Sequence, residues 1–484
     1  MRRRTVAPGG NMGKSHVFDA RTRMPVTAKD LFAWHAREGA FERLTPPWER
    51  MEVLERTGDG IRTGARVVVR MRVGPIPQRL VAEHTAYIED AMFQDTQMSG
   101  PFAKWVHTHR MWPEPTTGTS ILEDEVEYVL PVGTLGSLFG GGFARRTLER
   151  MFAYRHRVTL EDLKRHAAFA GQGPLTIAVT GASGLVGSSL VPFLTTGGHT
   201  VKRMVRGKAD PARNEVAWSP DTGEVDTDAL EGVDVVVHLA GVNVAGQRWT
   251  PEYKDAILKS RTQGTRTLAE ALARMKRKPK VLVSAGGSSI YGDRGDEVLA
   301  EESSTDGKGF LSQVSREWEA AAAPAEAAGI RVVHLRIGPV LDAREGALAK
   351  MLPAFLAGGG GPIGSGQQWM SWVSLEDLLG LIHFSVFTDA ARGAINAVAP
   401  GAVRQADFAR TLGKVLRRPA VFPVPSPVVR TLFGQMGQEA LLDGARIAPQ
   451  AAQRLGFAFL LPDLESALRF TLGRTTKGPE YHHS

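Results

Sequence analysis

A glycine-rich turn between a strand and a helix constrains the fold of this chain more than any other feature. Leu175–Thr180 is a continuous apolar run typical of a strand, Leu185–Thr196 has helical spacing, and Thr200–Arg206 is a second strand. The turn between the first two elements reads Gly181, Ala182, Ser183, Gly184, Leu185, Val186 and Gly187. Its first glycine permits a tight turn, its second lets the backbone approach a pyrophosphate, and its third lets the helix pack on the sheet. The pattern predicts a bound dinucleotide whose phosphates face the helix N-terminus.

The end of the second strand bears on which dinucleotide binds. An NAD-type site places Asp or Glu there to hold the ribose hydroxyls, and this strand has no acid. Arg206 is the candidate ligand of a 2′-phosphate, with Lys202 or Arg203 in support. We therefore expect NADP(H) rather than NAD(H). The alternative is that these charges are solvated at a strand end.

Strands and helices alternate beyond the glycine turn. Further strands are predicted at Val233–Ala240, Lys280–Ser284 and Arg331–Ile337, with helical segments between them. Apolar strands that alternate with helices predict a parallel sheet covered on both faces, a doubly wound α/β fold of the Rossmann type. We assign residues 174–420 to this domain and residues 421–480, which open on a Pro-rich stretch, to a small C-terminal domain.

The first part of the chain has a different pattern. A helix is predicted at Ala28–Ala36, and Phe143–Phe169 has the apolar stripe of a long helix. Extended runs broken by Gly and Pro are predicted at Ile61–Arg72, Arg79–Glu89, Trp105–Met111 and Ile121–Leu130. An antiparallel sheet that grips one long helix leaves a cavity suited to an apolar ligand. We therefore predict an α+β helix-grip domain over residues 13–170, preceded by a flexible tail over residues 1–12.

Composition removes several classes of protein. The chain has 484 residues, 43% of them hydrophobic and 23% charged, which suits a globular protein of two or three domains. The chain has no cysteine, so disulfides and Cys-ligated zinc are excluded. The net charge of +8 is spread among acidic residues, so we expect no nucleic-acid partner. No long apolar run and no signal peptide are evident, so we expect no membrane partner and a cytoplasmic location.

The second part of the chain resembles a known superfamily. The turn TGASGLVG, together with His238-Leu239-Ala240-Gly241 at the end of the predicted strand Val233–Ala240, is similar to extended and atypical short-chain dehydrogenases/reductases. One branch, the NAD-dependent epimerase/dehydratase-like family with a small C-terminal domain, is resembled in the segments Asn243–Trp249, Lys259–Leu268, Tyr291–Glu297 and Gly364–Leu378. The resemblance implies that Leu239, Ala240, Gly241 and Ser284 contact the cofactor beside the glycine turn.

The first part resembles a different superfamily. The stretches Phe41–Glu49, Gly100–Arg110 and Met151–Leu163 are similar to helix-grip domains of the START and polyketide-cyclase type. The resemblance implies a hydrophobic cavity and an apolar ligand for this domain.

The residues expected for short-chain dehydrogenase chemistry are missing. In the family a Tyr is activated by a Lys four residues later, and these positions fall near Leu311 and Ser315. Arg316 cannot act as a mild base because a guanidinium stays protonated. The family's serine position falls at Gly287, with Ser284, Ser288 and Ser289 nearby. Tyr291 is the remaining candidate for a catalytic acid, with a structural role as the alternative.

Loops after the strands supply candidates for the substrate side, because an open parallel sheet binds its ligand at the carboxyl ends of its strands. These candidates are Asn243, Arg248, Trp249, Gln368 and Trp369. Arg261 and Arg336 are further candidates for pairing with an anionic substrate, and Asp377 suits a helix start.

Histidines of the first part raise the question of a metal. His107 and His109 alternate on a strand and so share a face, and His84 is a candidate neighbour. No acid-plus-histidine signature accompanies them, so we expect cavity-lining or hydrogen-bonded histidines and no metal.

Three functions are compatible with these features. The leading one is an NADP(H)-binding oxidoreductase or epimerase-like enzyme for a small apolar or carbonyl-bearing substrate. The second is a catalytically silent NADP(H)-dependent sensor or ligand-binding regulator, which the missing Tyr and Lys favour. The third is a polyketide-cyclase-like activity that uses the histidines of the first part.

Overall fold

The computed structural model of the chain describes three stretches, residues 14–73, 76–131 and 133–475. Two compact units are present: unit 1 comprises residues 1–167 with 475–484, and unit 2 comprises residues 168–474. The tail expected over residues 1–12 lies outside the described residues. Within the described stretches, no helix is long and apolar enough to cross a membrane.

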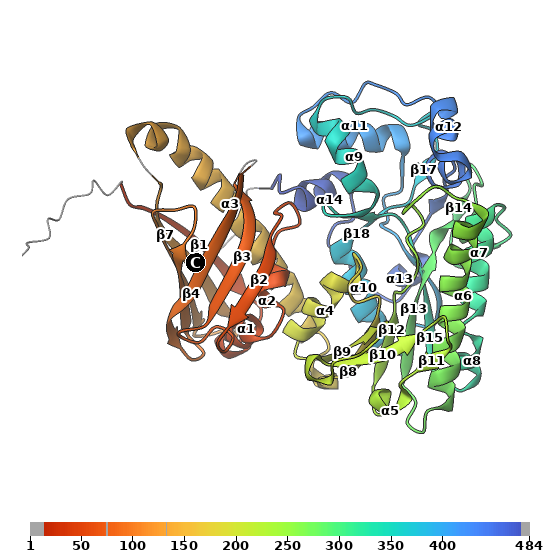
Figure 1. Ribbon diagram of the computed structural model, residues 1–484, viewed down its shortest axis with the longest axis horizontal. Coiled ribbons are helices and arrows are strands. Elements are labelled where there is room, and N and C mark those ends of the chain that lie inside the picture. Colours follow the sequence, from red (N-terminus) through yellow and green to blue (C-terminus); the bar gives the residue numbers. More distant parts are fainter. Residues whose placement is uncertain (1–13, 74–75, 132, 476–484) are drawn as a thin grey trace, which may run out of the picture. The chain divides into compact units, whose positions relative to one another are not determined.

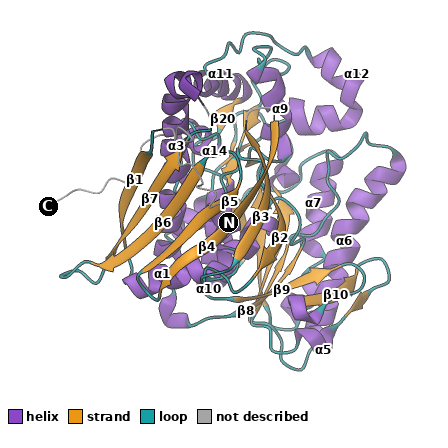
Figure 2. Cartoon of the chain, turned by 60° about the vertical axis from the view of Figure 1, so that its left-hand side comes forward, coloured by secondary structure: helices purple, strands orange, loops and turns teal. Residues whose placement is uncertain are grey.

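Unit 1 is built on a seven-stranded antiparallel sheet in the order β1-β7-β6-β5-β4-β3-β2. Its strands are β1 His16–Met24, β2 Glu52–Thr57, β3 Arg66–Val73, β4 Ile76–Ile88, β5 Met92–Ser99, β6 Lys104–Pro113 and β7 Ser120–Val129. Its helices are α1 Ala28–Ala36, α2 Ala40–Leu44 and α3 Gly133–Ala167. Figures 1 and 2 show the curved sheet with the long helix α3 beside it. The predicted helix-grip fold is confirmed.

Two strands of this sheet carry no clear signal in the sequence, and hydrophobic periodicity does not predict them. The edge strand β2 is mostly exposed, so it lacks the apolar alternation that marks a half-buried strand. The central strand β5, MFQDTQMS, places Asp95 two residues after the buried Phe93, on the face that packs inward. A polar residue at an inward position breaks the expected pattern.

Helix α3 is held to the rest of unit 1 by aromatic packing and a buried ion pair. Phe152 on α3 lies 5.2 Å from the ring of Phe18 on β1 and 5.3 Å from His107 on β6. Arg43 of α2 makes two hydrogen bonds, of 2.7 and 2.8 Å, to the carboxylate of Asp162 on α3. Both side chains of this pair are buried, so removal of either partner would leave an uncompensated charge.

Unit 2 contains an eight-stranded sheet in the order β11-β10-β9-β8-β12-β13-β15-β19. Its strands are β8 Thr176–Thr180, β9 Thr200–Val205, β10 Glu215–Ser219, β11 Glu224–Val225, β12 Val235–His238, β13 Val281–Gly287, β15 Arg331–Ile337 and β19 Gly393–Ala397. Every pair in it is parallel except β10 with β11. The strand order reverses between β8 and β12, which is the switch point of a doubly wound fold. The predicted Rossmann-type sheet is confirmed.

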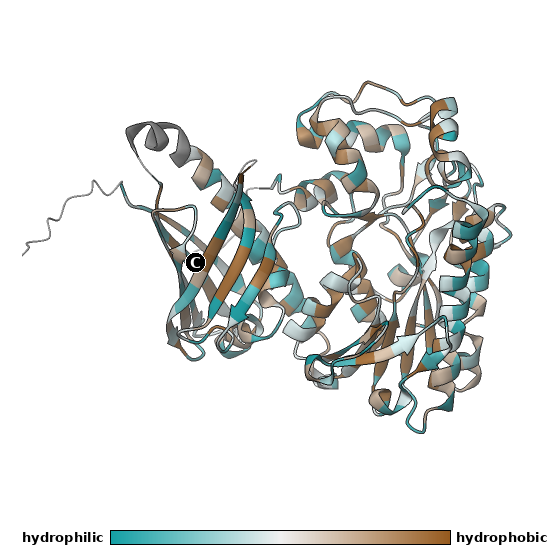
Figure 3. Ribbon diagram, viewed as in Figure 1, coloured by the Kyte–Doolittle hydropathy of each residue, from teal (hydrophilic) through white to brown (hydrophobic). Residues whose placement is uncertain are grey.

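Helices cover both faces of this sheet. Val235 and Val237 of β12 pack with the core that includes α4 Gly187–Thr196 and α10 Leu375–Phe387, whereas Val236 packs with the core under α6 Pro251–Arg274 and α8 Ala323–Ala327. Figure 3 shows the apolar strands at the centre of unit 2. Burial on both faces explains why these strands appear in the sequence as continuous apolar runs.

Further helices and short strands of unit 2 lie outside the elements described above. The other elements of this unit are α5 Thr227–Leu230, β14 Val298–Leu299, α7 Phe310–Ala320, β16 Val340–Leu341, α9 Gly346–Leu356, β17 Trp369–Met370, β18 Val373–Ser374, β20 Val403–Arg404, α11 Gln405–Leu416, α12 Ser426–Gly437, β21 Arg446–Ile447, α13 Gln450–Arg454 and α14 Leu464–Thr471.

Asp377 ties the C-terminal region to helix α10. Its backbone N–H donates to Ser374 Oγ at the helix start, over 3.0 Å. Its carboxylate accepts hydrogen bonds from the backbone amides of Leu460 and Leu461, at 2.6 and 3.1 Å. The expected place at a helix start is therefore correct, and the same side chain also anchors a distant segment.

Candidate functional site

The glycine turn lies at the switch point of the unit 2 sheet. Gly181 has a φ of +66°, and a Cβ there would lie 2.9 Å from the carbonyl carbon of Leu239. A Cβ on Gly187 would lie 2.2 Å from Gly181 O, so only glycine lets α4 approach the turn this closely. Gly184 is different, because a Cβ there would meet only Gly181 O, at 3.4 Å, and would otherwise point into open space. That open space is where the phosphates of a dinucleotide would approach, so the turn fits such a cofactor.

Backbone amides of the turn are available to an anion. Within the part of the chain that the structure describes, the N–H groups of Ser183, Leu185 and Val186 have no acceptor. They precede the first turn of α4, where the helix dipole also favours negative charge. Unpaired amides at a helix start form a ready site for phosphate.

A buried histidine fixes the loop on the other side of the switch point. His238 is fully buried at the end of β12, with Nδ1 2.7 Å from Thr180 Oγ1 and Nε2 2.9 Å from Thr265 Oγ1. Thr180 Oγ1 also accepts from the backbone amides of Leu239 and Ala240, at 3.0 and 3.2 Å. Burial lowers the pKa of His238 to about 4, so the imidazole is neutral at physiological pH. This network holds the loop that starts with Leu239 beside the glycine turn.

Gly241 follows this loop and packs on an arginine. The guanidinium of Arg261 lies against Gly241, where a Cβ would come within 3.2 Å of Arg261 Cζ. Arg261 Nη1 donates to Val242 O at 2.9 Å, and its guanidinium lies 4.9 Å from the ring of Trp318. Burial lowers the pKa of Arg261 to about 10, so it stays charged. Its donors mainly support the loop.

Arg206 directly follows β9, and its guanidinium is accessible to a ligand. The sheet register pairs Thr180 with Met204, so Arg206 lies at the carboxyl ends of the strands, where the glycine turn begins. Lys202 donates to Ala229 O at 2.6 Å and Arg203 to Arg213 O at 3.4 Å. Arg206 is exposed, and among the described residues its guanidinium has no hydrogen-bond or ion-pair partner. The structure therefore leaves Arg206, rather than Lys202 or Arg203, free to take a phosphate.

A hydroxyl group stands at the position of the missing lysine. Ser289 Oγ lies 3.1 Å from Ser315 Oγ, and Ser315 is at the position that the family gives to lysine. Gly287 stands where the family has its serine, and a Cβ there would lie 2.6 Å from Ser315 Oγ. The Ser289–Ser315 pair therefore fills the space that a side chain at residue 287 would need. Ser284 is buried on β13, with Oγ 3.4 Å from Ala285 O. No pattern in the sequence singles out the Ser289–Ser315 pair.

Tyr291 is fully buried, and its hydroxyl already has two partners. It donates to Asn396 Oδ1 at 2.8 Å and accepts from Arg336 Nη1 at 2.7 Å. Burial raises the pKa of the Tyr291 phenol, although Arg336 opposes this shift. Arg336 is itself paired with Glu319, at 2.7 and 3.0 Å, and so is not free for a substrate anion. A catalytic role for Tyr291 stays a prediction.

The loop after β12 carries three substrate-side candidates. Asn243 Oδ1 accepts from the amide of Ala245 at 2.9 Å, which shapes the loop. Trp249 Nε1 donates to Val244 O at 2.8 Å, and its ring lies 5.1 Å from Phe310 at the start of α7. Arg248 is exposed and has no side-chain partner among the described residues. Of the three side chains, that of Arg248 has its hydrogen-bond donors available to a substrate.

Gln368 and Trp369 instead connect segments within unit 2. Gln368 Nε2 donates to Ile363 O at 3.0 Å and to Leu441 O at 2.8 Å. Trp369 lies between two cations, with the guanidiniums of Arg404 and Arg446 at 4.1 and 4.6 Å from its ring, and its Nε1 donates to Asp296 at 2.9 Å. Both side chains have structural partners, and a contact with substrate stays a prediction.

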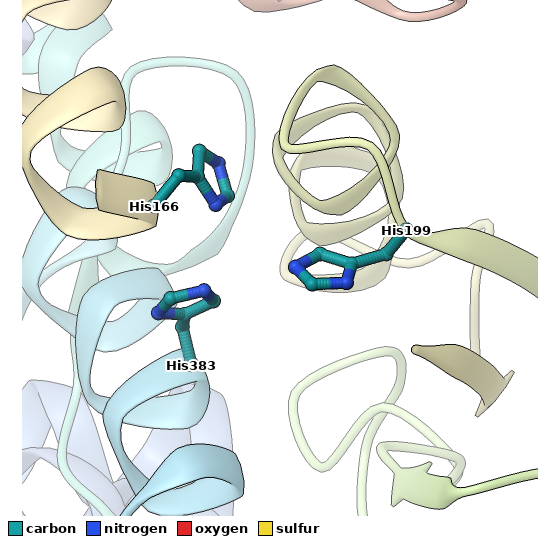
Figure 4. Close-up of side chains that lie close together, drawn as sticks. All are labelled: His166, His199 and His383. Carbon is teal, nitrogen blue, oxygen red and sulfur yellow. The ribbon is translucent and has the colours of Figure 1, made fainter. Parts of the chain in front are cut away.

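Two further histidines of unit 2 lie at the amino ends of the parallel strands, whereas the glycine turn lies at their carboxyl ends. His199 directly precedes β9, and His383 is on α10, with ring centroids 6.0 Å apart (Figure 4). His199 Nδ1 accepts from the amide of Leu175 at 3.1 Å. The third side chain in Figure 4, His166, belongs to α3 of unit 1. The pair in unit 2 packs among aromatic rings that include Phe387.

Unit 1 contains a polar cluster that the sequence only partly predicts. His107 and His109 share the inner face, as expected, and Asp95 and Asp124 join them from β5 and β7. His156 on α3 adds a third imidazole, with Nε2 2.7 Å from Asp124 Oδ2. We call Asp95, His107, His109, Asp124 and His156 the His–Asp cluster. The two acids lie on strands apart from the His-x-His pair, so no local motif shows them.

A glycine turn at the switch point of a doubly wound sheet, with open amides and an open arginine, defines a dinucleotide-binding fold. Residues 177–397 match the NAD dependent epimerase/dehydratase family, residues 424–471 match a domain of unknown function (DUF1731), and residues 24–153 match the polyketide cyclase/dehydrase and lipid transport family. Two curated relatives match over nearly their whole length: epimerase family protein Mb2239 of Mycobacterium bovis and human epimerase family protein SDR39U1. The former is 39% identical over 62% of this chain and 98% of its own, and the latter 34% identical over 61% and 99%. The chain therefore belongs to the epimerase family.

Two solved structures extend the comparison. A nucleoside-diphosphate sugar epimerase from Corynebacterium glutamicum is 32% identical, with a TM-score of 0.75, and the match covers 94% of this chain and 90% of that one. Human SDR39U1, solved with NADPH, is 31% identical with a TM-score of 0.57, and the match covers 62% of this chain and 100% of that one.

Proposed function

We propose that this chain is an NADP(H)-binding oxidoreductase or epimerase-like enzyme that acts on a small, carbonyl-bearing molecule, with an apolar ligand bound in unit 1. The observation that carries the cofactor preference is Arg206, an exposed guanidinium without a partner among the described residues, at the carboxyl ends of the strands where the glycine turn begins. The absence of an acid at the end of β9 supports it. The human relative whose structure was solved with NADPH supports it further.

The residues near the switch point have distinct tasks in this proposal. The amides of Ser183, Leu185 and Val186 bind the pyrophosphate, and Arg206 binds the 2′-phosphate. The nicotinamide cofactor supplies hydride transfer when it is bound. Ser315 Oγ donates to Leu311 O at 2.8 Å, and Ser289 Oγ, 3.1 Å from Ser315 Oγ, donates a hydrogen bond to the reacting oxygen, while water supplies the proton.

Arg248 has the substrate-side task. Its exposed guanidinium has no side-chain partner among the described residues, so it is open to an anionic group of the substrate. The neighbouring Trp249 shapes the same loop through its bond to Val244 O. The substrate would therefore combine a carbonyl with an anionic group.

Equilibrium titration with NADPH and with NADH tests the cofactor preference. The wild-type chain should bind NADPH at least tenfold more tightly, and Arg206→Ala should remove that difference, because a charge-assisted hydrogen bond contributes about 1.5–3 kcal/mol. The control is Arg277→Ala. Arg277 is exposed and precedes β13, at the amino ends of the strands and away from the glycine turn. Equal affinities for the two cofactors, or a preference that survives Arg206→Ala, would contradict the assignment.

A silent sensor is the second candidate, favoured by the Leu311 and Ser315 that stand where the family has Tyr and Lys. Turnover of a panel of carbonyl compounds with NADPH separates the two. Tight NADPH binding without turnover would support the sensor. Turnover that falls in Ser289→Ala with Ser315→Ala would support the enzyme, and turnover lost in Tyr291→Phe would instead identify Tyr291 as the proton donor.

A further inference from the structure

The His–Asp cluster of unit 1 collects its members from separate elements on one side of the sheet. The register sets His107 opposite Asp95, and His109 opposite Asp124. Residues two apart on a strand share a face, so both imidazoles point inward together. His107, His109, Asp124 and His156 are buried, and Asp95 is half-buried. Such polar groups are stable in an interior only when their charges and lone pairs are satisfied.

Three ligand atoms of the cluster are spaced like donors that share one ion. Asp95 Oδ1 lies 3.3 Å from His107 Nδ1 and 3.7 Å from His109 Nε2, and the ligand atoms of these three residues all lie within 4.8 Å of one another. Ligands bound about 2.0–2.1 Å from a tetrahedral zinc lie roughly 3.4 Å apart. Direct hydrogen bonds are shorter, about 2.7–3.2 Å. The observed spacing therefore fits an ion between the three side chains.

The outer nitrogens of both imidazoles face a second carboxylate. His107 Nε2 lies 2.9 Å and His109 Nδ1 lies 2.5 Å from Asp124 Oδ1. The other oxygen of Asp124 pairs with His156 Nε2, and His156 Nδ1 lies 2.8 Å from Thr22 Oγ1. Imidazoles that bind a metal almost always direct their other nitrogen to a carboxylate or carbonyl, which fixes the ring and its tautomer. Asp124 holds His107 in this way through a hydrogen bond, whereas its contact with His109 Nδ1 is close but lacks hydrogen-bond geometry.

A metal-free explanation of the cluster exists and has to be tested against the metal site. Burial acts to lower the pKa of His107, but the carboxylates of Asp124 and Asp95 outweigh burial and raise the pKa to about 9. A protonated His107 between two carboxylates would then balance part of their charge. The other charged or titratable groups that act on the cluster are His35, His84 and Arg155.

We propose that Asp95, His107 and His109 bind one divalent transition-metal ion, with zinc as the expected ion, and that Asp124 and His156 position the two imidazoles. Two histidines and one carboxylate are the ligand set of catalytic zinc and of non-haem iron(II) sites, which keep coordination positions open for water or a substrate oxygen. The ion would give the polyketide-cyclase-like unit a Lewis acid of its own. This proposal departs from our sequence-based expectation of no metal, because Asp95 and Asp124 come from strands that no local motif connects to the histidines.

Zinc titration of the full chain tests the site. The terminal histidines His482 and His483, which lie outside the described residues, are replaced by Ser in every sample so that they bind no metal. After chelator treatment, the chain should take up one equivalent of Zn²⁺, and X-ray absorption should show two imidazole ligands. Asp95→Asn, which keeps the side-chain shape, and His107→Ala should each lower the affinity by at least about 100-fold. Asp124→Asn should lower it by about 10–100-fold, as expected for a group that orients ligands.

His16→Ala is the matched control, because His16 stacks on Tyr128 at 5.4 Å and is not a member of the cluster. It should leave zinc binding unchanged. Circular dichroism and the NADPH titration of each variant show whether the chain is folded. No zinc retained by the folded wild-type chain, or equal affinity in wild type and Asp95→Asn, would overturn the metal site and leave the protonated His107 as the explanation.

Discussion

At the scale of single residues, buried hydrogen bonds decide which side chains near the switch point are open. His238 has only hydroxyl partners, Thr180 and Thr265, and stays neutral because burial lowers its pKa to about 4. Arg336 and Tyr291 are hydrogen-bonded to each other and to Glu319 and Asn396. Arg206 has no such partner among the described residues, which makes it the phosphate ligand of the proposal.

His238 predicts a loss of stability in acid. Its pKa falls from 6.5 to about 4 on folding, so the unfolded chain binds the proton more tightly between these values. Stability from the neutral imidazole is fully present above pH 6.5 and is lost as the pH falls toward 4, by up to about 3 kcal/mol. Hydrogen exchange of the Val235–Val237 amides, corrected for intrinsic rates, should show weaker protection at pH 4.5 than at pH 6.5. In His238→Gln this difference should shrink, and an undiminished difference would assign it to other groups.

The sequence predicts single residues well where the signal is local. The glycine turn and Arg206 belong to one short strand–helix–strand segment, and the structure leaves Gly184 and Arg206 exposed. Tyr291 and Arg336 are different, because their partners Asn396 and Glu319 come from other elements. Nothing in their own neighbourhood indicates that their polar groups are already satisfied.

At the scale of elements, the contact between α4 and the turn before it controls the shape of the phosphate site. The helix begins at Gly187, over the carbonyl of Gly181 and the Cα of Ala182. The predicted helix and both flanking strands are found with bounds within two residues of the expected ones. In unit 1, by contrast, β5 is missed because its inward residues include Asp95, and hydrophobic periodicity cannot detect a strand that lines a polar cluster.

Gly187→Ala should destabilise the start of α4. The new methyl group would lie 2.2 Å from Gly181 O and 2.7 Å from Ala182 Cα, so the helix must move away from the turn. Such overpacking costs about 1–3 kcal/mol. We expect faster hydrogen exchange in the first turn of α4 and weaker NADPH binding. Unchanged exchange there would mean that the close approach of helix and turn is not required.

At the scale of the whole molecule, the comparisons separate the roles of the two units. The M. bovis and human relatives match 62% and 61% of this chain but 98% and 99% of their own length, so in those proteins the epimerase unit stands without unit 1. The Corynebacterium glutamicum epimerase matches over 94% of this chain and includes both parts. The match to the epimerase family therefore lies in unit 2, and the metal site that we propose lies in unit 1.

The NADPH affinity of Gly184→Ala tests most directly whether the glycine turn is a cofactor site. The nearest neighbour of the new methyl group is Gly181 O at 3.4 Å, so the fold should tolerate it, but it occupies the open side where the pyrophosphate approaches. We predict unchanged thermal stability in the absence of cofactor and an affinity for NADPH at least tenfold weaker, a loss of about 1.4 kcal/mol. A folded Gly184→Ala chain that binds NADPH as tightly as wild type would contradict a cofactor site at this turn.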